Sequence, residues 1–200
     1  LFRSQIKFMY YRPRIPKNLL SDLREGLIIG SACEAGELFT AVVDGQSDAY
    51  LENLAQFYDY LEIQPIANNE FMIRKGIAAD EEALRDYNRK IIALGEKLNK
   101  PVVATCDVHF LDPEDEVYRR IIMAGKGFKD ADNQAPLFLR TTEEMLKEFD
   151  YLGSERAYEI VVENTNRIAD MVDRIEPVRP DKCPPVIDNS DGILTEICHK

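Results

Sequence analysis

A long amphipathic helix followed at once by an apolar strand constrains the fold of this chain more than any other feature. Asp80 suits the N-cap of the helix, with acidic residues in its first turn, and Asn99 and Pro101 end it. The apolar residues 102–104 then predict a short buried strand. One stripe at helical spacing predicts the buried face of the helix: Leu84, Tyr87, Ile91, Leu94 and Leu98.

Shorter segments before and after this unit repeat the alternation of strand and helix. Residues 27–29 predict a strand, followed by a turn of small residues and a helix that begins near Glu34. Residues 48–58 predict a helix, residues 59–65 a strand, and residues 114–124 a further helix. This alternation is typical of parallel strands covered by helices, so we expect an α/β fold.

The chain is acidic as a whole but basic at its start. With 200 residues, a formal charge of -11 and a pI near 4.8, it should repel nucleic-acid phosphates unless a local basic patch intervenes. Residues 1–18 interleave basic and aromatic side chains, and two interpretations stay open. The segment could stack on nucleic acid, or it could dock on an acidic body. Its cations and aromatics are Arg3, Lys7, Phe8, Tyr10, Tyr11, Arg12, Arg14 and Lys17.

Cysteine usage and hydropathy indicate a reducing compartment and no membrane segment. The cysteines form no CxxC pair or dense framework, so reduced thiols in a cytoplasmic protein are expected, with one of them a possible metal ligand. No apolar run approaches the roughly 20 residues that span a bilayer, and nothing resembles a signal peptide. Because the chain opens without methionine, we expect it to be a piece of a longer protein.

Candidate metal ligands follow or lie within the predicted strands. Asp107 and His109 are two residues apart just after residues 102–104, and an extended chain would aim both side chains to one face. Cys33 follows the first strand, where the next helix would lower the pKa of its thiol, and Glu62 lies in the middle strand. Sites collect at the carboxyl ends of parallel strands, so these residues together predict a metal site. Each also has an ordinary alternative: a polar turn for Asp107 and His109, a buried small residue for Cys33, and a solvated strand face for Glu62.

The last part of the chain predicts helices and a linker without an obvious catalytic set. Thr141 and Glu144 form a capping-box pattern, and Gly153 ends that helix. Ser154 is the expected cap of a longer helix, and several prolines between residues 177 and 185 indicate an extended linker. One stripe predicts the buried face of the longer helix: Ala157, Ile160, Val161, Asn164, Ile168, Met171 and Ile175.

Several motifs, in order along nearly the whole chain, resemble the PHP (polymerase and histidinol phosphatase) domain, and most closely that of PolC-type replicative polymerases, the α subunits of bacterial DNA polymerase III. The helical stretch that follows the domain in those polymerases is matched as well. The motifs are Gly30-Ser-Ala-Cys-Glu-Ala-Gly-Glu37, Phe57-Tyr-Asp-Tyr-Leu-Glu-Ile-Gln-Pro65, Pro101-Val-Val-Ala-Thr-Cys-Asp-Val-His109, Leu111-Asp-Pro-Glu-Asp115, Arg140-Thr-Thr-Glu-Glu-Met145 and Val162-Glu-Asn-Thr165.

The resemblance implies a partial distorted (β/α) barrel of PHP type in residues 1–125, resuming after an inserted 3′–5′ exonuclease, and a mainly helical appendage in residues 126–200. It implies that Cys33, Glu62, Asp107 and His109 bind divalent metal, which could be Mn, Zn or Mg. The chain departs from related domains in having no histidine after Gln64 and in having Cys106 where glycine is common.

The resemblance also implies partners and leaves two functional classes open. The partners are the remaining half of the PHP domain, the exonuclease and polymerase regions, DNA reached through the parent polymerase, and the replication sliding clamp. In the first class, the segment is a metal-stabilised scaffold for the other regions. In the second, it supplies half of a metal-dependent 3′–5′ exonuclease or phosphoesterase centre.

Overall fold

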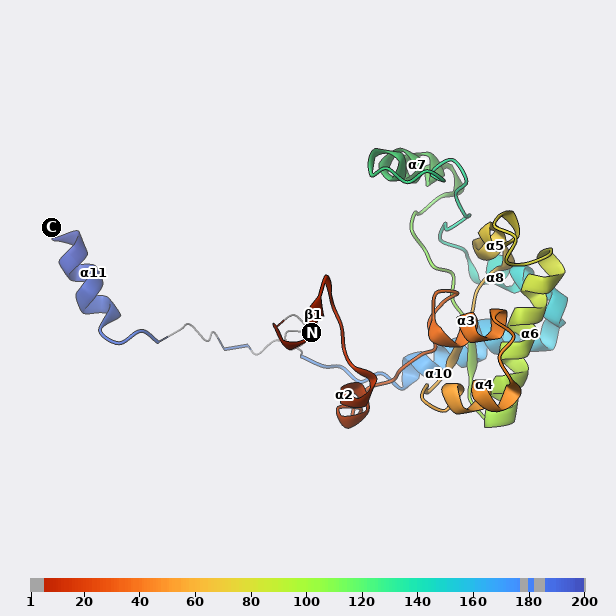
Figure 1. The fold of residues 1–200 in the computed structure, drawn as a ribbon, viewed down its shortest axis with the longest axis horizontal. Coiled ribbons are helices and arrows are strands. Elements are labelled where there is room, and N and C mark those ends of the chain that lie inside the picture. Colours follow the sequence, from red (N-terminus) through yellow and green to blue (C-terminus); the bar gives the residue numbers. More distant parts are fainter. Residues whose placement is uncertain (1–5, 177–179, 182–185, 200) are drawn as a thin grey trace. The chain divides into compact units, whose positions relative to one another are not determined.

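The computed structural model describes residues 6–176, 180–181 and 186–199, and the chain forms two compact units, Leu1–Ala169 and Asp170–Lys200 (Figure 1). The elements of the first unit begin with β1 (Met9–Tyr10), β2 (Arg12–Pro13), α2 (Lys17–Asp22), α3 (Glu37–Val43), α4 (Asp48–Ala55), β3 (Leu61–Ile63), the 3₁₀ turn η1 (Ile66–Asn69), α5 (Glu70–Arg74), α6 (Glu81–Leu98) and β4 (Val102–Ala104). They continue with the 3₁₀ turn η2 (Pro113–Asp115), α7 (Glu116–Gly125), α8 (Thr142–Glu148), the 3₁₀ turn η3 (Asp150–Leu152), α9 (Ser154–Tyr158), the π-helical segment η4 (Glu159–Glu163) and α10 (Asn164–Asp170).

The strand predicted at residues 59–65 forms as β3. It is the central strand of the fold and pairs in parallel with β4. Leu61 lies opposite Val102 and Ile63 opposite Ala104. The backbone of Tyr60 and Glu62 faces the other way, where Gly30 forms an isolated parallel bridge with Tyr60. The three segments therefore run in the same direction, and their carboxyl ends share one edge.

The predicted strand over residues 27–29 is wrong, because only the carbonyl of Ile29 pairs with the backbone before β3, where it accepts the N–H of Asp59 at 2.7 Å. Leu27 donates its N–H to the carbonyl of Arg24 in a turn, and its side chain is 47% exposed. Ile29 donates to the carboxylate of Asp59 at 2.7 Å instead of to a strand. Only the next residue, Gly30, forms a β-bridge, with Tyr60. The neighbouring helix also begins later than predicted, at Glu37, because Gly36 donates to the carbonyl of Cys33 and closes a turn first.

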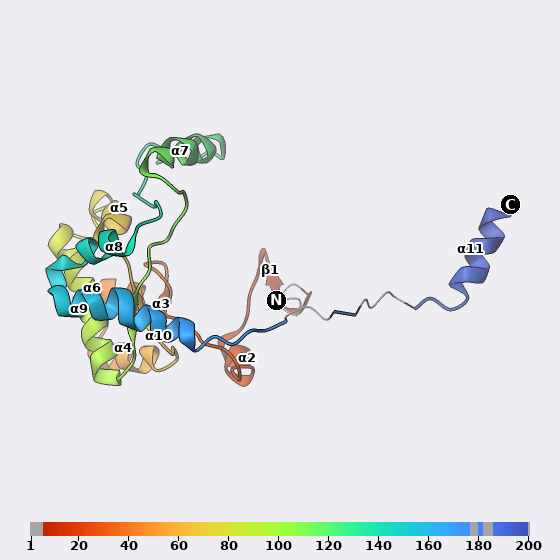
Figure 2. The same cartoon turned by 180° about the vertical axis from the view of Figure 1, so that it is seen from behind.

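The core lies between two helical layers that enclose the small sheet. On one side α3 and α4 pack against α6, and on the other α9 and α10 cross the body, as the view from behind shows (Figure 2). Leu61 and Ile63 are at most 1% exposed, and burying each such side chain stabilises the fold by about 1.5–3 kcal/mol. The predicted stripe of α6 is confirmed, with Leu84, Ile91 and Leu94 buried.

The caps of α6 and α8 are confirmed residue by residue. Asp80 accepts the N–H of Ala83 at 2.9 Å, and Asn99 closes α6 in the left-handed conformation. Thr141 and Glu144 form the reciprocal capping box at the start of α8. These caps satisfy N–H groups of the first turn that have no partner within the helix.

The predicted long helix after Gly153 forms with two differences. Gly153, at φ +84°, is the N-cap residue, and Ser154 is the first helical residue and makes no cap bond. The rod then passes through the π-helical η4 and ends at Asp170. Ala157, Ile160 and Asn164 are buried as predicted, whereas Met171 and Ile175 lie past the helix end and are 52% and 75% exposed.

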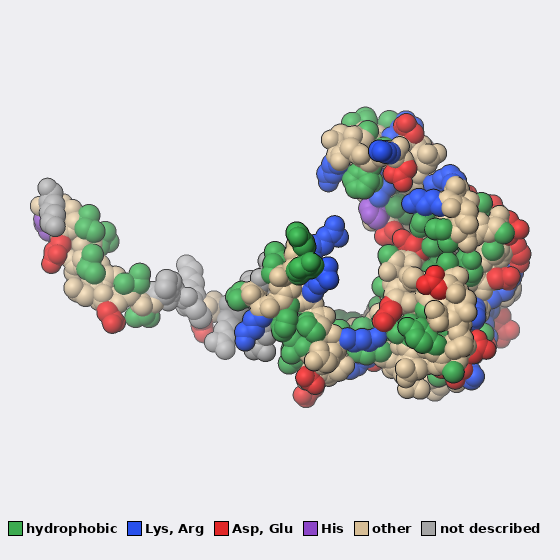
Figure 3. Space-filling model, viewed as in Figure 1, with side chains coloured by type: hydrophobic (Ala, Val, Ile, Leu, Met, Phe, Trp, Pro, Cys, Tyr) green, Lys and Arg blue, Asp and Glu red, His purple; other side chains and the backbone are tan. Residues whose placement is uncertain are grey.

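Residues 106–140 leave the sheet edge and return to it with α7 in between. Phe110 and Phe138 form a parallel bridge where the outgoing and returning segments meet. The apolar face of α7 is uncovered, and hydrophobic side chains reach its surface in the space-filling view (Figure 3). Tyr118, Ile121 and Ile122 are 63%, 63% and 58% exposed, so α7 adds nothing to the core of the described chain.

The basic, aromatic start of the chain forms a small exposed hairpin of β1 and β2, with Arg14 stacked over Tyr10 at 5.3 Å. Lys17 binds Glu37 at 2.8 Å and lies 4.6 Å from the centre of the Phe57 ring. Its contacts fit the docking interpretation for this residue, while the nucleic-acid interpretation of the hairpin stays a prediction. Arg3 lies outside the described residues.

In the second unit the structure describes α11 (Ser190–Cys198). Most of the predicted proline linker, including Pro177, Pro184 and Pro185, lies outside the described residues, as does Cys183. Cys33, Cys106 and Cys198 are free thiols. None of the helices in the described ranges is both long and apolar enough to cross a membrane. The partial PHP barrel and the division at residue 125 stay predictions.

Candidate functional site

The candidate site is the edge formed by the carboxyl ends of the Gly30 segment, β3 and β4. Two side chains tie the segments together just beyond the ladder. Ser31 is 2% exposed and accepts the backbone N–H of Glu62 at 2.9 Å. Asn68 donates its side-chain amide to the carbonyl of Cys106 at 3.1 Å. These bonds continue the sheet where regular pairing has ended, and so they fix the loops that carry the predicted ligands.

Asp107 and His109 are brought together by a tight turn after β4. Asp107 has a left-handed backbone, with φ +56°, and its carbonyl lies 2.9 Å from Nδ1 of His109. A carbonyl oxygen can only accept a hydrogen bond, so Nδ1 is the donor in this contact and Nε2 is the ring nitrogen that the contact leaves free. Both side chains are 41% exposed, and the Asp107 carboxylate is 3.7 Å from Nδ1. A histidine held through one ring nitrogen by a carbonyl is the usual arrangement of a metal-binding imidazole.

Glu62 is half-buried beside Gly30 on the outer side of β3. A Cβ on Gly30 would overlap the Tyr60 ring and lie 2.6 Å from Oε1 of Glu62, so the absence of a side chain at Gly30 lets both side chains pack against its backbone. Burial, and then the charge of Glu62, raise the pKa of Tyr60. Within the described part of the chain the carboxylate has no hydrogen-bond or ion-pair partner, which leaves its oxygens available to a ligand.

Cys33 lies in the turn between Gly30 and α3 and is half-buried. Burial is the largest influence on its thiol, and it raises the pKa, with Glu34 adding to the effect. The predicted lowering of the pKa by a helix N-terminus is therefore wrong, because α3 begins only at Glu37.

The four predicted ligands do not form a single cluster within the ranges that the structure describes. No group of three or more His, Cys, Asp or Glu side chains there is placed to hold a metal ion. Asp107 and His109 are adjacent, whereas Cys33 and Glu62 follow or belong to the neighbouring segments. A closed coordination shell takes about four ligands, so further donors would have to complete it. The metal site stays a prediction.

Sequence reasoning missed a buried cation next to this turn. The Arg140 side chain is 1% exposed, and its Nε donates to Glu148 at 3.1 Å. Its Nη1 donates to the sulfur of Cys106 at 3.3 Å. Glu148 is only eight residues from Arg140, but Cys106 is thirty-four residues away, so no local pattern could have paired the guanidinium with the sulfur. The only sequence signal was the motif that begins at Arg140.

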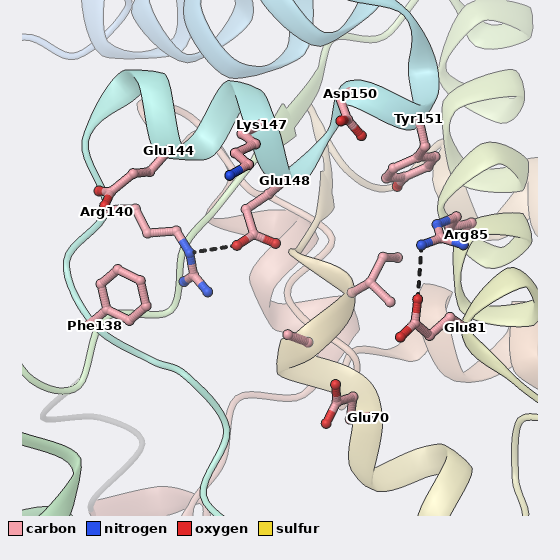
Figure 4. A pocket seen from close by; sticks show the side chains of 12 residues that line it. Glu70, Glu81, Arg85, Phe138, Arg140, Glu144, Lys147, Glu148, Asp150 and Tyr151 are labelled. Carbon is pink, nitrogen blue, oxygen red and sulfur yellow. Dashed lines mark hydrogen bonds and ion pairs between the residues drawn. The ribbon is translucent and has the colours of Figure 1, made fainter. Parts of the chain in front are cut away.

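A cavity of about 410 Å³ lies between η1, α6 and α8, and Arg140 forms one wall of it (Figure 4). Glu148 and Phe138 flank the guanidinium, and Arg85 and Glu81 pair on the opposite wall. Asn88, 1% exposed, ties this region to the sheet by donating to the carbonyl of Gln64 and to the Tyr151 hydroxyl, both at 3.0 Å. The two arginines of the wall are thus each paired with a carboxylate, and the cavity offers no metal cluster among the described residues.

Nearly the whole chain is similar to a stretch of much longer bacterial proteins. It is 59% identical over 188 residues to DNA polymerase III PolC-type of Clostridium perfringens, which covers 94% of this chain and 13% of that protein. It is 57% identical over 195 residues to DNA polymerase III PolC-type of Caldanaerobacter subterraneus, and 43% identical over 200 residues to that of Bacillus subtilis; each match covers 98% of this chain and 14% of the relative.

The chain thus spans about one seventh of the length of the curated relatives it matches. No protein-family model matches it.

Proposed function

We propose that this chain is a segment of a PolC-type DNA polymerase III, a DNA-directed DNA polymerase that acts in replication. Identities of 43–59% over 94–98% of the chain are the observation that carries this proposal. Within that polymerase, residues 1–125 form the later part of a PHP domain. Residues 126–200 form a helical connection toward the polymerase core. The parallel alignment of Gly30, β3 and β4 supports a barrel segment.

The segment acts as a metal-stabilised scaffold for the exonuclease and polymerase regions. Support comes from the turn after β4, where the Nδ1 contact leaves Nε2 of His109 free and the carboxylate of Asp107 lies beside the ring. Zn, Mn and Mg differ in how strongly they prefer imidazole nitrogen or carboxylate oxygen, so a donor set with one of each leaves the metal identity open. Cys33 and Glu62 are the further donors from this chain, and the remaining half of the PHP domain supplies the rest.

A second role for the same turn is hydrolytic. Asp107 and His109 are both 41% exposed, so solvent water reaches them. A divalent ion bound there supplies Lewis-acid chemistry that lowers the pKa of water. In this role the segment contributes half of a 3′–5′ exonuclease or phosphoesterase centre, with Asp107 and His109 holding the ion.

The partners follow from the same proposal. The formal charge of -11 disfavours direct binding to nucleic acid, so DNA is engaged mainly through the other regions of the polymerase. Contact with the replication sliding clamp and a cytoplasmic location complete the proposal.

The test uses the intact polymerase that carries this segment, with its inserted exonuclease inactivated. Manganese-dependent removal of 3′ nucleotides and the melting temperature with and without a chelator are measured for the wild type and for Asp107→Asn. Asp132→Asn is the matched control, because it makes the same change at an exposed position between α7 and α8.

The scaffold role predicts no hydrolysis, and it predicts a chelator-sensitive melting temperature that Asp107→Asn lowers and Asp132→Asn leaves unchanged. Hydrolysis that is lost in Asp107→Asn would replace the scaffold role with the catalytic one. Melting that responds to neither chelator nor Asp107→Asn, without hydrolysis, would remove the metal role altogether. Normal DNA synthesis after deletion of the whole segment would count against both.

A further inference from the structure

Cys106, the residue immediately before Asp107, is held by three separate contacts. Its thiol donates to the carbonyl of Phe138 at 3.3 Å. Its sulfur accepts from Nη1 of Arg140 at 3.3 Å. Its own carbonyl accepts the side-chain amide of Asn68 at 3.1 Å. Cys106 is therefore anchored at its carbonyl by the loop after β3 and at its sulfur by the segment that returns from α7.

Arg140 is the most rigid of these anchors. Its side chain is buried, its Nε is fixed by Glu148 on α8, and its guanidinium lies 4.4 Å from the centre of the Phe138 ring (Figure 4). A buried guanidinium held by a carboxylate and a ring has little freedom to move. The sulfur of Cys106, which the guanidinium contacts, is therefore held in place.

The turn that follows needs such an anchor. Asp107 is in the left-handed region at φ +56°, which aspartate adopts more readily than most residues with a side chain but which still costs free energy, so the contacts around the turn help to hold it there. The hydrogen bond from Nδ1 of His109 to the Asp107 carbonyl depends on this backbone conformation. Release of the anchor would let Asp107 relax to negative φ and would break the bond that selects the histidine tautomer.

We propose that Arg140 is the positioning residue of the Asp107–His109 turn and that it acts through the sulfur of Cys106. The inference rests on the proposed function, because the purpose of this positioning is to leave Nε2 of His109 free to bind a metal ion. Arg140 touches neither a metal nor a substrate in this role. It sets the geometry of the two residues that do.

The histidine tautomer is the direct readout, because a merely structural role would not move it. The chain contains only two histidines, His109 and His199, so nitrogen spectra of a ¹⁵N-histidine-labelled sample resolve both, with His199 as the internal reference. The spectra are recorded without metal on the wild type, Arg140→Met, Cys106→Ala and Cys106→Ser. We expect the Nδ1–H tautomer at His109 in the wild type and its loss, toward a mixed pattern, in Arg140→Met and Cys106→Ala. Cys106→Ser keeps both a donor and an acceptor and should retain the wild-type tautomer.

Arg156→Met is the matched control, since Arg156 likewise forms ion pairs, with the carboxylates of Glu96 and Glu159, but lies at the opposite end of β4. It should lower the melting temperature and leave the His109 spectrum unchanged. An unchanged His109 tautomer in Cys106→Ala overturns the proposal, and so does an equal change in Arg156→Met. If Arg140→Met fails to fold, the two Cys106 variants decide alone. Because the spectra need no metal, a failure of the proposed metal role in the intact polymerase would leave this result standing separately.

Discussion

Asn164 donates its side-chain amide to the carbonyl of Val102 at 2.9 Å, and both residues are buried. The bond joins the start of α10 to the first residue of β4, on the edge that β3 does not cover. It satisfies a backbone acceptor that neither the helix nor the strand could satisfy alone.

Replacing Asn164 with alanine should therefore lower the free energy of unfolding by about 1–3 kcal/mol, because the Val102 carbonyl stays buried without a donor. Urea unfolding followed by circular dichroism measures the change. Asn166→Ala, on the exposed side of the same helix, should stay within about 0.5 kcal/mol of the wild type. Equal effects at the two positions would show that the bond does not form in solution.

Gly95 and Gly125 should respond in opposite directions to the same substitution. Both are helical, but a Cβ on Gly95 would overlap Cγ2 of Val102, whereas a Cβ on Gly125 would meet nothing within 4 Å. Gly95→Ala should cost about 1–3 kcal/mol from overpacking, and Gly125→Ala should be neutral or stabilise by up to about 1 kcal/mol through helix propensity. Thermal unfolding of both variants checks this, and Val102→Ala combined with Gly95→Ala should recover part of the loss. A stabilising Gly95→Ala would contradict the close packing of α6 on β4.

Stability should fall at alkaline pH through Tyr58. Burial, followed by the charge of Glu37 and a hydrogen bond to it at 3.2 Å, raises the pKa of Tyr58 to about 12 from an ordinary value near 10. The folded state therefore holds the phenolic proton more tightly than the unfolded state does. The stabilisation is complete below pH 10 and is lost as the pH rises toward 12.

Tyr58→Phe removes this titrating group, so its stability should decline less steeply between pH 10 and pH 12 in urea unfolding. Glu37→Gln should flatten the decline only in part, because burial is the larger cause. Tyr118→Phe, an exposed change on α7, should keep the wild-type decline. Identical slopes for wild type and Tyr58→Phe would remove Tyr58 as the source.

The exposed face of α7 should contribute nothing to the stability of this chain on its own. Ile91 in α6 is 1% exposed, and Ile91→Ala should cost about 2–5 kcal/mol. Ile121 in α7 is 63% exposed, and Ile121→Ala should stay within about 0.5 kcal/mol of the wild type. Chemical unfolding of the two variants compares them directly. A large loss in Ile121→Ala would mean that α7 is covered.

Features set by neighbouring residues could be predicted from the sequence. The caps at Asp80 and Thr141 depend on residues three or four positions away, and the structure confirms both. Strand β4 followed from a short apolar run, and β3 lies within the predicted strand at residues 59–65, where apolar and polar residues alternate. In contrast, the strand expected at residues 27–29 failed because the side chain of Asp59, thirty residues away, takes the N–H of Ile29.

The candidate site shows the same division. The spacing of Asp107 and His109 indicated that the two side chains lie close together, and the turn does bring them together. The spacing could not indicate that Asp107 has a left-handed backbone. Nor could it indicate that Arg140 and Asn68 hold Cys106, because those contacts arise only when distant segments pack. The late start of α3 likewise depended on how the Cys33–Gly36 turn fits against Ser31, and the burial that raises the pKa of Cys33 depends on packing that the sequence does not show.

The π-helical η4 separates α9 from α10 within one continuous rod. Each residue of an α-helix turns the chain by about 100°, so removing one residue from η4 to restore regular winding would rotate everything after it by that angle. Asn164 would then turn away from Val102, and the Val102 carbonyl of β4 would lose its hydrogen bond. The wider turn of η4 thus offsets the angular positions of α9 and α10 about the helix axis, so that each helix packs against a different neighbour.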